Sequence, residues 1–253
     1  MKISRLLLCV AFVFVPVLLG AQAKIYTRKA KLEDFSVKTT KVVTDGRSIV
    51  EINFKNEVTS RWRVSPYEFC PIEDYDKFKN DNSYYFLRLV TEDGIAFLAL
   101  SKGGKEDDAD RLKKPFEVVR IPIGTAGVSM GTDIVYMGAF LDILQAFTEE
   151  AVVSDKTGYA GLELCNFKGM EGKTVCLGEA SAESFFSEQK EDMLIPVCFA
   201  PEPEGEWCYK MLMDAGTHEL FYFRRQRYKA ETDIEFSDLE IKSFSKRHAE
   251  LIR

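Results

Sequence analysis

The sequence predicts an α+β fold made of two similar halves, each a small mixed sheet packed by helices. Hydrophobic residues make up 46% of the 253 residues and aromatic residues 12%, which is enough to bury a core. Strand and helix patterns follow one another without the regular strand–helix repeats of a doubly wound sheet. When the chain is shifted by 110 positions, residues of similar character coincide. The coinciding pairs include Glu73 and Glu183, Tyr75 and Phe185, Leu87 and Val197, and Leu89 and Phe199.

This similarity divides the chain into an N-terminal unit of residues 24–150 and a C-terminal unit of residues 151–253. The second unit is a diverged repeat of the first, or the similarity arises by chance. In either case we expect each half to bury one face of its sheet under helices.

The first unit begins with a strand at residues 37–43, which the turn at Asp45 and Gly46 closes. From Ser48 onward, apolar residues recur at every fourth position, which predicts a helix with one apolar face. These apolar residues are Val50, Phe54, Val58 and Trp62.

An aromatic-rich segment comes next. Residues 64–70 have the composition of a strand. Pro71 then opens a short acidic helix that carries Tyr75 and Phe78 on one face.

A hairpin is the clearest local feature of the sequence. Two apolar strands at residues 84–90 and 95–100 flank Asp93 and Gly94, and an Asp-Gly step favours the two-residue turn of a β-hairpin. A further strand is predicted at residues 116–123.

A longer helix is predicted after the glycine-rich residues 124–132. It begins at Thr132 or Asp133 and ends at Glu149, and residues 150–161 are expected to form a connector.

The second unit repeats the order of strand, short acidic helix and strand. A hairpin return is predicted at residues 207–213, followed by the turn at Asp214 and Gly216 and a last strand at residues 219–228. Residues 236–253 are expected to form a C-terminal helix or a semi-ordered tail.

Residues 1–23 have the three parts of a secretory signal peptide. Lys2 and Arg5 form a positive head, fourteen apolar residues follow, and the segment ends in Ala-Gln-Ala at Ala23. The apolar run is shorter than the ~20 residues that span a bilayer. We therefore expect cleavage after Ala23, no transmembrane segment afterwards, and a periplasmic, secreted or cell-surface location. The absence of an Asn-x-Ser/Thr acceptor from residues 24–253 favours a bacterial protein.

Charge excludes general nucleic-acid binding. Loss of residues 1–23 removes two cations and no acidic residue, so the formal charge changes from −6 to −8. An acidic surface is not attracted to a phosphate backbone.

Five cysteines remain after cleavage, and their spacing gives no C-x-x-C pair, so no metal site is predicted. They are interpreted as small buried apolar residues. One disulfide among the last four is the alternative, because the compartment is oxidising. The five are Cys70, Cys165, Cys176, Cys198 and Cys208.

Three segments resemble a family of uncharacterised secreted bacterial proteins. They are residues 62–70 (WRVSPYEFC), 84–87 (YYFL) and 136–141 (YMGAFL). The resemblance covers most of the first half and implies export and a mixed α/β fold. It implies no activity and assigns no functional residue.

The one catalytic motif is Gly127-Val128-Ser129-Met130-Gly131, which matches the G-x-S-x-G turn of serine hydrolases. Its base would be His218 or His248, the only histidines, with Asp155, Asp192 or Asp214 as the orienting carboxylate. The residues before the motif are not an apolar central strand, so a loop that precedes the next helix is the preferred interpretation.

The remaining polar and aromatic clusters predict no site. The acidic loop at residues 106–110 lacks the glycine and the distal glutamate of a calcium loop. The acidic residues 202–206 are interpreted as a hairpin loop with exposed carboxylates, and no cofactor is expected. Aromatic residues near the last strand fit a sheet face better than a sugar- or peptide-binding surface. These are Trp207, Phe221, Tyr222, Phe223 and Tyr228. The sequence therefore predicts a non-catalytic exported protein that binds an envelope protein or a small ligand, with a serine hydrolase using Ser129 and His218 as the alternative.

Overall fold

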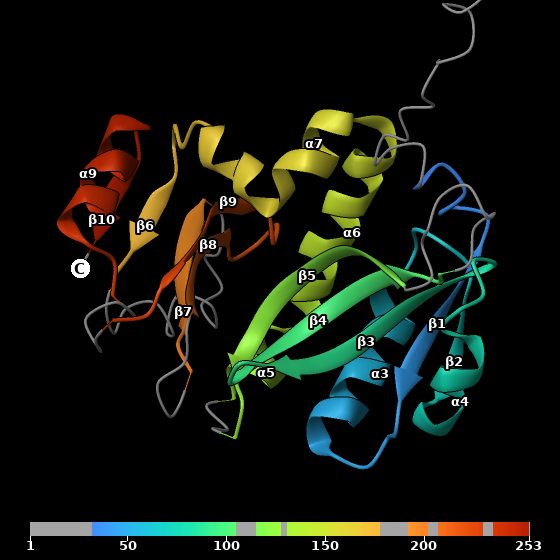
Figure 1. The fold of residues 1–253 in the computed structure, drawn as a ribbon. Helices are drawn as coiled ribbons and strands as arrows, with labels where there is room; N and C mark the ends of the chain where they lie inside the picture. Colours follow the sequence, from blue (N-terminus) through green and yellow to red (C-terminus); the bar gives the residue numbers. More distant parts are fainter. Residues whose placement is uncertain are drawn as a thin grey trace, which may run out of the picture.

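The structure is a computed structural model that describes residues 32–104, 115–127, 131–177, 192–201, 207–229 and 235–252. Residues 1–23 and Ser129 lie outside these ranges. The predicted α+β class with two similar halves is confirmed, because the chain forms two mixed five-stranded sheets packed by helices. Figure 1 shows the sheets side by side. None of the helices in the described ranges has both the length and the apolar character needed to cross a membrane.

The first sheet has the strand order β2-β1-β3-β4-β5. Strand β1 pairs in parallel with both β2 and β3, and β3, β4 and β5 form an antiparallel meander. The strands are β1 (Thr39–Thr44), β2 (Tyr67–Pro71), β3 (Tyr84–Glu92), β4 (Ile95–Lys102) and β5 (Phe116–Thr125). The predicted hairpin is confirmed: Glu92 pairs with Ile95, and Asp93 and Gly94 both have positive φ, as a type I′ turn requires.

Two of the helices that pack on the first sheet were predicted with their approximate starts. Helix α3 (Ile49–Arg61) begins at the N-cap Ser48, whose hydroxyl oxygen accepts a hydrogen bond from the Glu51 N–H. Its apolar stripe is buried at Phe54 and Val58. Helix α4 (Ile72–Phe78) packs its aromatic side chains against a small cluster on the outer face of the sheet. That cluster consists of Val43, Cys70 and Phe86.

The helix predicted from Thr132 to Glu149 is broken in two. A turn of helix, α5 (Thr132–Val135), ends at Tyr136, and α6 (Met137–Val153) continues from it. The expected connector at residues 150–161 is wrong. Ser154 ends α6 and caps α7 (Asp155–Ala160), and a 3-10 helix, η2 (Gly161–Phe167), follows directly.

The second sheet has the order β10-β6-β7-β8-β9 and repeats the strand directions of the first. Strand β6 pairs in parallel with β10 and β7, and β7, β8 and β9 are antiparallel. The strands are β6 (Thr174–Cys176), β7 (Met193–Phe199), β8 (Trp207–Asp214), β9 (Leu220–Arg227) and β10 (Glu250–Ile252). The C-terminal segment forms helix α9 (Asp238–Lys246) and β10, so it is part of the second sheet.

The outer edge strand reaches its place differently in the two halves. In the first sheet, the edge strand β2 follows its neighbour β1 through α3; in the second, the edge strand β10 comes last in the chain and follows α9. The spatial arrangement is therefore repeated while the order along the chain is changed.

One hydrophobic core joins the two halves. It contains buried residues of both sheets and of α6, which crosses the expected boundary at residue 150. The rings of Phe97 and Tyr209 lie 5.4 Å apart, and those of Phe140 and Phe199 lie 6.2 Å apart. Each of these ring pairs joins one half to the other. A separate cluster under α9 covers the outer face of the second sheet.

Candidate functional site

His218, the candidate base, lies in the turn between β8 and β9. Its backbone has a φ of +60°, and its N–H donates to the Asp214 carbonyl oxygen at 3.0 Å. Its side chain is 15% exposed. Ser129, the candidate nucleophile, is outside the described residues. His248 lies after α9 at the far end of the second sheet, beside β10.

The His218 imidazole is held by a chain of charged groups. Its Nδ1 lies 2.7 Å from the Asp142 Oδ2, and the same oxygen accepts a hydrogen bond from Arg61 at 2.8 Å. Arg61 also donates to the Glu57 carboxylate at 2.7 Å. Burial alone would lower the pKa of Arg61, but its bond to Glu57 and the charge of Asp142 outweigh burial and raise it. The guanidinium therefore stays charged and holds Asp142 in place.

The three carboxylates proposed from the sequence to orient His218 do not do so. Asp214 binds Lys173 at 2.8 Å and accepts the N–H groups of the following turn. Asp192 also binds Lys173, and Asp155 lies in the first turn of α7. The orienting carboxylate is Asp142. The sequence could have indicated Asp142, because it is the single charged residue in the apolar segment 137–147.

A pocket of about 530 Å³ lies beside this pair. It is formed by α6, α7, η2 and the β8–β9 turn, in the upper middle of Figure 1. The wall is mostly apolar, and its apolar side chains are Ile143, Ala146, Phe147, Leu162, Leu164, Cys165, Phe167 and Leu220. Three of these residues lie in the predicted helix and four lie directly after the predicted connector, in a segment to which the sequence assigned no element, so the sequence did not predict the pocket.

The polar groups of the pocket lie at its margins. Lys168 pairs with Glu219 at 2.8 Å. The Thr157 hydroxyl donates to the Glu150 carboxylate at 2.9 Å. Lys156 is exposed.

The pocket cysteine is buried, and burial disfavours its thiolate form. Burial raises the pKa of the Cys165 thiol to about 12, so it stays protonated. Burial likewise raises the pKa of Cys198 to about 12. None of the five cysteines forms a disulfide with another in the described part of the chain, and four of them are buried, which agrees with the apolar interpretation and not with the disulfide alternative.

The aromatic residues near the last strand are packed in the sheet. Phe221, Tyr222 and Phe223 are at most 8% exposed. Trp207 is half-buried, with the guanidinium carbons of Arg225 and Arg227 at 4.0 and 4.5 Å from its ring centroid. In the described part of the chain, no three His, Cys, Asp or Glu side chains gather as metal ligands would.

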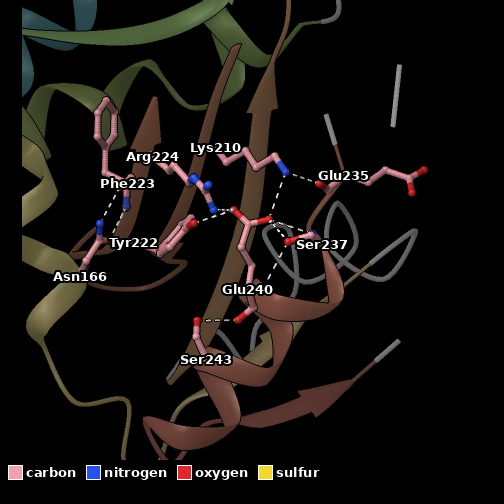
Figure 2. Close-up of polar contacts among 9 residues, drawn as sticks. All are labelled: Asn166, Lys210, Tyr222, Phe223, Arg224, Glu235, Ser237, Glu240 and Ser243. Atoms are coloured by element: carbon pink, nitrogen blue, oxygen red, sulfur yellow. Dashed lines mark hydrogen bonds and ion pairs between the residues drawn. The ribbon is translucent and has the colours of Figure 1, made fainter. Parts of the chain in front are cut away.

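A buried cluster of charged groups lies away from the pocket, where α9 packs on the second sheet. Figure 2 shows the Glu240 carboxylate surrounded by Tyr222, Lys210, Arg224 and Ser237. Ser237 and Glu240 form a capping box at the start of α9. Lys210 and Glu240 are 2% and 4% exposed, so this cluster is closed to ligands and fixes the helix on the sheet.

The edge of β9 is covered by polar side chains from other elements. Asn166 on η2 both donates to the Phe223 carbonyl oxygen and accepts from its N–H, at 2.8 and 2.9 Å (Figure 2). Arg247 donates to the Phe221 carbonyl oxygen at 2.8 Å. These contacts occupy groups with which another strand would pair, and they attach η2, one wall of the pocket, to the sheet.

No family model matches this chain, and comparison with curated proteins and with solved structures gives no significant match.

Proposed function

We propose that this chain is an exported, non-catalytic binding protein that holds a small ligand in the pocket between α6, α7, η2 and the β8–β9 turn. The observation that carries the proposal is the pocket itself. Its volume of about 530 Å³ falls in the range of small-molecule sites, which are ~300–1,000 Å³ and mostly apolar with a few fixed polar groups. Asp142 and His218 in the pocket wall are such fixed polar groups, because Asp142 is bound by both His218 and Arg61.

Export is supported by the signal-peptide pattern of residues 1–23. The N-terminus of protein recovered from cells tests it. We expect the chain to start at Lys24 outside the cytoplasm; a chain that starts at Met1 in the cytosol contradicts export.

Binding is tested with N-phenyl-1-naphthylamine, an apolar dye whose fluorescence rises when it leaves water. We expect saturable binding to the wild-type protein. The Ala146→Trp variant fills the pocket from an exposed position on α6, so its affinity for the dye should fall at least tenfold. Leu239→Trp, on the surface of α9 and 78% exposed, is the matched control and should bind as the wild type does. If the two variants bind the dye with equal affinity, the dye binds outside the pocket and the proposal is contradicted.

A serine hydrolase remains the second candidate function. The observation that favours it is the Asp142–His218 pair, since a base held by a carboxylate is the part of a triad that activates a serine. A fluorophosphonate probe distinguishes the two. The binding proposal predicts that Ser129 stays unlabelled, and labelling that is lost in a Ser129→Ala variant would support the hydrolase.

A further inference from the structure

Two charged side chains of the pocket wall form no ion pair within the part of the chain that the structure describes. The Glu150 carboxylate, on α6, accepts only the Thr157 hydroxyl there, at 2.9 Å. Lys156, on α7, is exposed and has no carboxylate partner among the described residues. The pocket therefore offers a ligand one carboxylate and one ammonium group.

These two groups lie at the same end of the pocket. Thr157 directly follows Lys156 on α7, and its hydroxyl is the group that binds Glu150. Because consecutive Cα atoms are only about 3.8 Å apart, the Lys156 backbone lies close to the Glu150 carboxylate. The lysine ammonium is carried on a flexible stem, so a ligand that contacts Glu150 is also within its reach.

The other charges of the pocket wall are matched by protein groups. Asp142 is bound by His218 and by Arg61. Lys168 is bound by Glu219. A charged group of a ligand therefore finds its partner at the end of the pocket where α6 meets α7.

Apolar side chains border the two unmatched charges. Glu150 continues the stripe formed by Ile143, Ala146 and Phe147 on α6, since residues three and four apart share one face of a helix. A ligand whose charges are held by Glu150 and Lys156 places its body against this stripe. Burial of that body adds favourable free energy in proportion to its apolar area.

A ligand with a single charge would bind one of the two groups and leave the other unmatched. An anion bound by Lys156 would also be repelled by Glu150, and a cation bound by Glu150 would be repelled by Lys156, because like charges repel most strongly at short range. A ligand that carries both charges avoids this repulsion and pairs with both side chains.

We infer that the ligand is a zwitterion whose ammonium and carboxylate groups are attached to one carbon atom of an apolar body, which is the chemistry of an apolar α-amino acid. This inference rests on the proposed binding function. The ligand ammonium pairs with Glu150, the ligand carboxylate pairs with Lys156, and the apolar side chain lies against α6.

Three compounds with the same phenyl body test the inference by displacing the naphthylamine dye. L-Phenylalanine carries both charges, 3-phenylpropanoate carries only the carboxylate, and 2-phenylethylamine carries only the ammonium group. We expect L-phenylalanine to displace the dye at a concentration at least fivefold lower than either single-charge compound, which corresponds to ~1 kcal/mol. The factor is modest because ion pairs of exposed side chains are weak.

Two single-charge variants assign the contacts. Lys156→Gln should weaken the binding of L-phenylalanine about fivefold and leave that of 2-phenylethylamine no weaker. Glu150→Gln, whose amide oxygen can still accept the Thr157 hydroxyl, should also weaken L-phenylalanine and leave 3-phenylpropanoate no weaker. Glu149→Gln and Lys246→Gln, at exposed positions outside the pocket wall, are the matched controls and should bind all three compounds as the wild type does.

The outcomes separate the two proposals. If the dye binds and Ala146→Trp blocks it, but a single-charge compound displaces the dye as well as L-phenylalanine does, the inference about the ligand is wrong and the binding proposal stands. The same holds if neither Lys156→Gln nor Glu150→Gln weakens L-phenylalanine. If the dye does not bind in the pocket, the binding proposal itself fails.

Discussion

Replacement of Glu240 by alanine is expected to lower the free energy of unfolding by about 3–5 kcal/mol, because it leaves a buried ammonium group without its carboxylate. The Lys210 Nζ lies 3.1 Å from the Glu240 carboxylate, and Lys210 is 2% exposed. The same carboxylate accepts the Tyr222 hydroxyl at 2.6 Å and the Ser237 N–H at 2.8 Å. Each of these partners loses its bond to the carboxylate in the variant, and Lys210 keeps only the Glu235 carbonyl oxygen as an acceptor among the described residues (Figure 2). Urea denaturation measures the change.

Glu163→Ala is the control for this experiment, since Glu163 is exposed on η2 and surface substitutions usually change stability by less than ~0.5 kcal/mol. A loss below 1 kcal/mol in Glu240→Ala would contradict the account, because it would mean that Lys210 is not held buried by this carboxylate.

The same carboxylate predicts a specific dependence of stability on pH. Burial by itself would raise the pKa of Glu240, but its hydrogen bonds with Tyr222 and Ser237 outweigh burial and lower the pKa from 4.5 to about 2. Because the pKa of Glu240 is depressed in the folded state, the ionised carboxylate stabilises the fold. Its contribution to the free energy of unfolding is fully present above pH 4.5 and is lost as the pH falls toward 2. A shift of this size corresponds to about 3 kcal/mol. Glu240→Gln removes the titrating group, so its stability should fall less than that of the wild type over this range.

Phe140→Ala is expected to lower the free energy of unfolding by ~3–5 kcal/mol, the usual cost of removing a buried phenyl ring. Phe140 on α6 is fully buried and contacts Tyr136 and Phe199, each with a centroid distance of 6.2 Å. It therefore packs in the core that joins the two halves, and the variant should destabilise both halves together.

The two tryptophans report the halves separately. Trp62 ends α3 in the first half, and Trp207 begins β8 in the second. Trp207→Phe leaves Trp62 as the only tryptophan, and Trp62→Phe leaves Trp207. Phe140→Ala is introduced into each of these single-tryptophan variants, and unfolding is followed by tryptophan fluorescence. The unfolding transitions reported by Trp62 and by Trp207 should coincide, and Phe140→Ala should shift both by the same amount. A shift in one transition alone would show that the halves unfold as independent domains.

Local sequence signals predicted the elements that are determined by neighbouring residues. The positive φ values at Asp93 and Gly94 follow from their turn chemistry, and the buried stripe of α3 follows from its four-residue spacing. Features of the fold that depend on contacts between residues distant in the sequence were not predicted. Residue 136 interrupts a helix whose apolar pattern continues through it, and β10 joins a strand that lies more than seventy residues earlier in the chain.

The candidate site was predicted only in part, for the same reason. His218 was named as a candidate base from the sequence, but its partner Asp142 lies 76 residues away on another element. The pocket depends on α7 and η2, which have weak helical patterns and are fixed by packing and by the contacts of Asn166 with β9. No short-range pattern encodes such contacts.

Mapping the bound dye by NMR shows whether the pocket between α6, α7, η2 and the β8–β9 turn is the binding site. In a titration of ¹⁵N-labelled protein with N-phenyl-1-naphthylamine, we expect the largest amide shifts in α6, α7, η2 and the turn at residues 217–220. The amides under α9, around Glu240, should move little. Perturbations concentrated outside the pocket, or none at saturating dye, would contradict the claim that this pocket is the binding site.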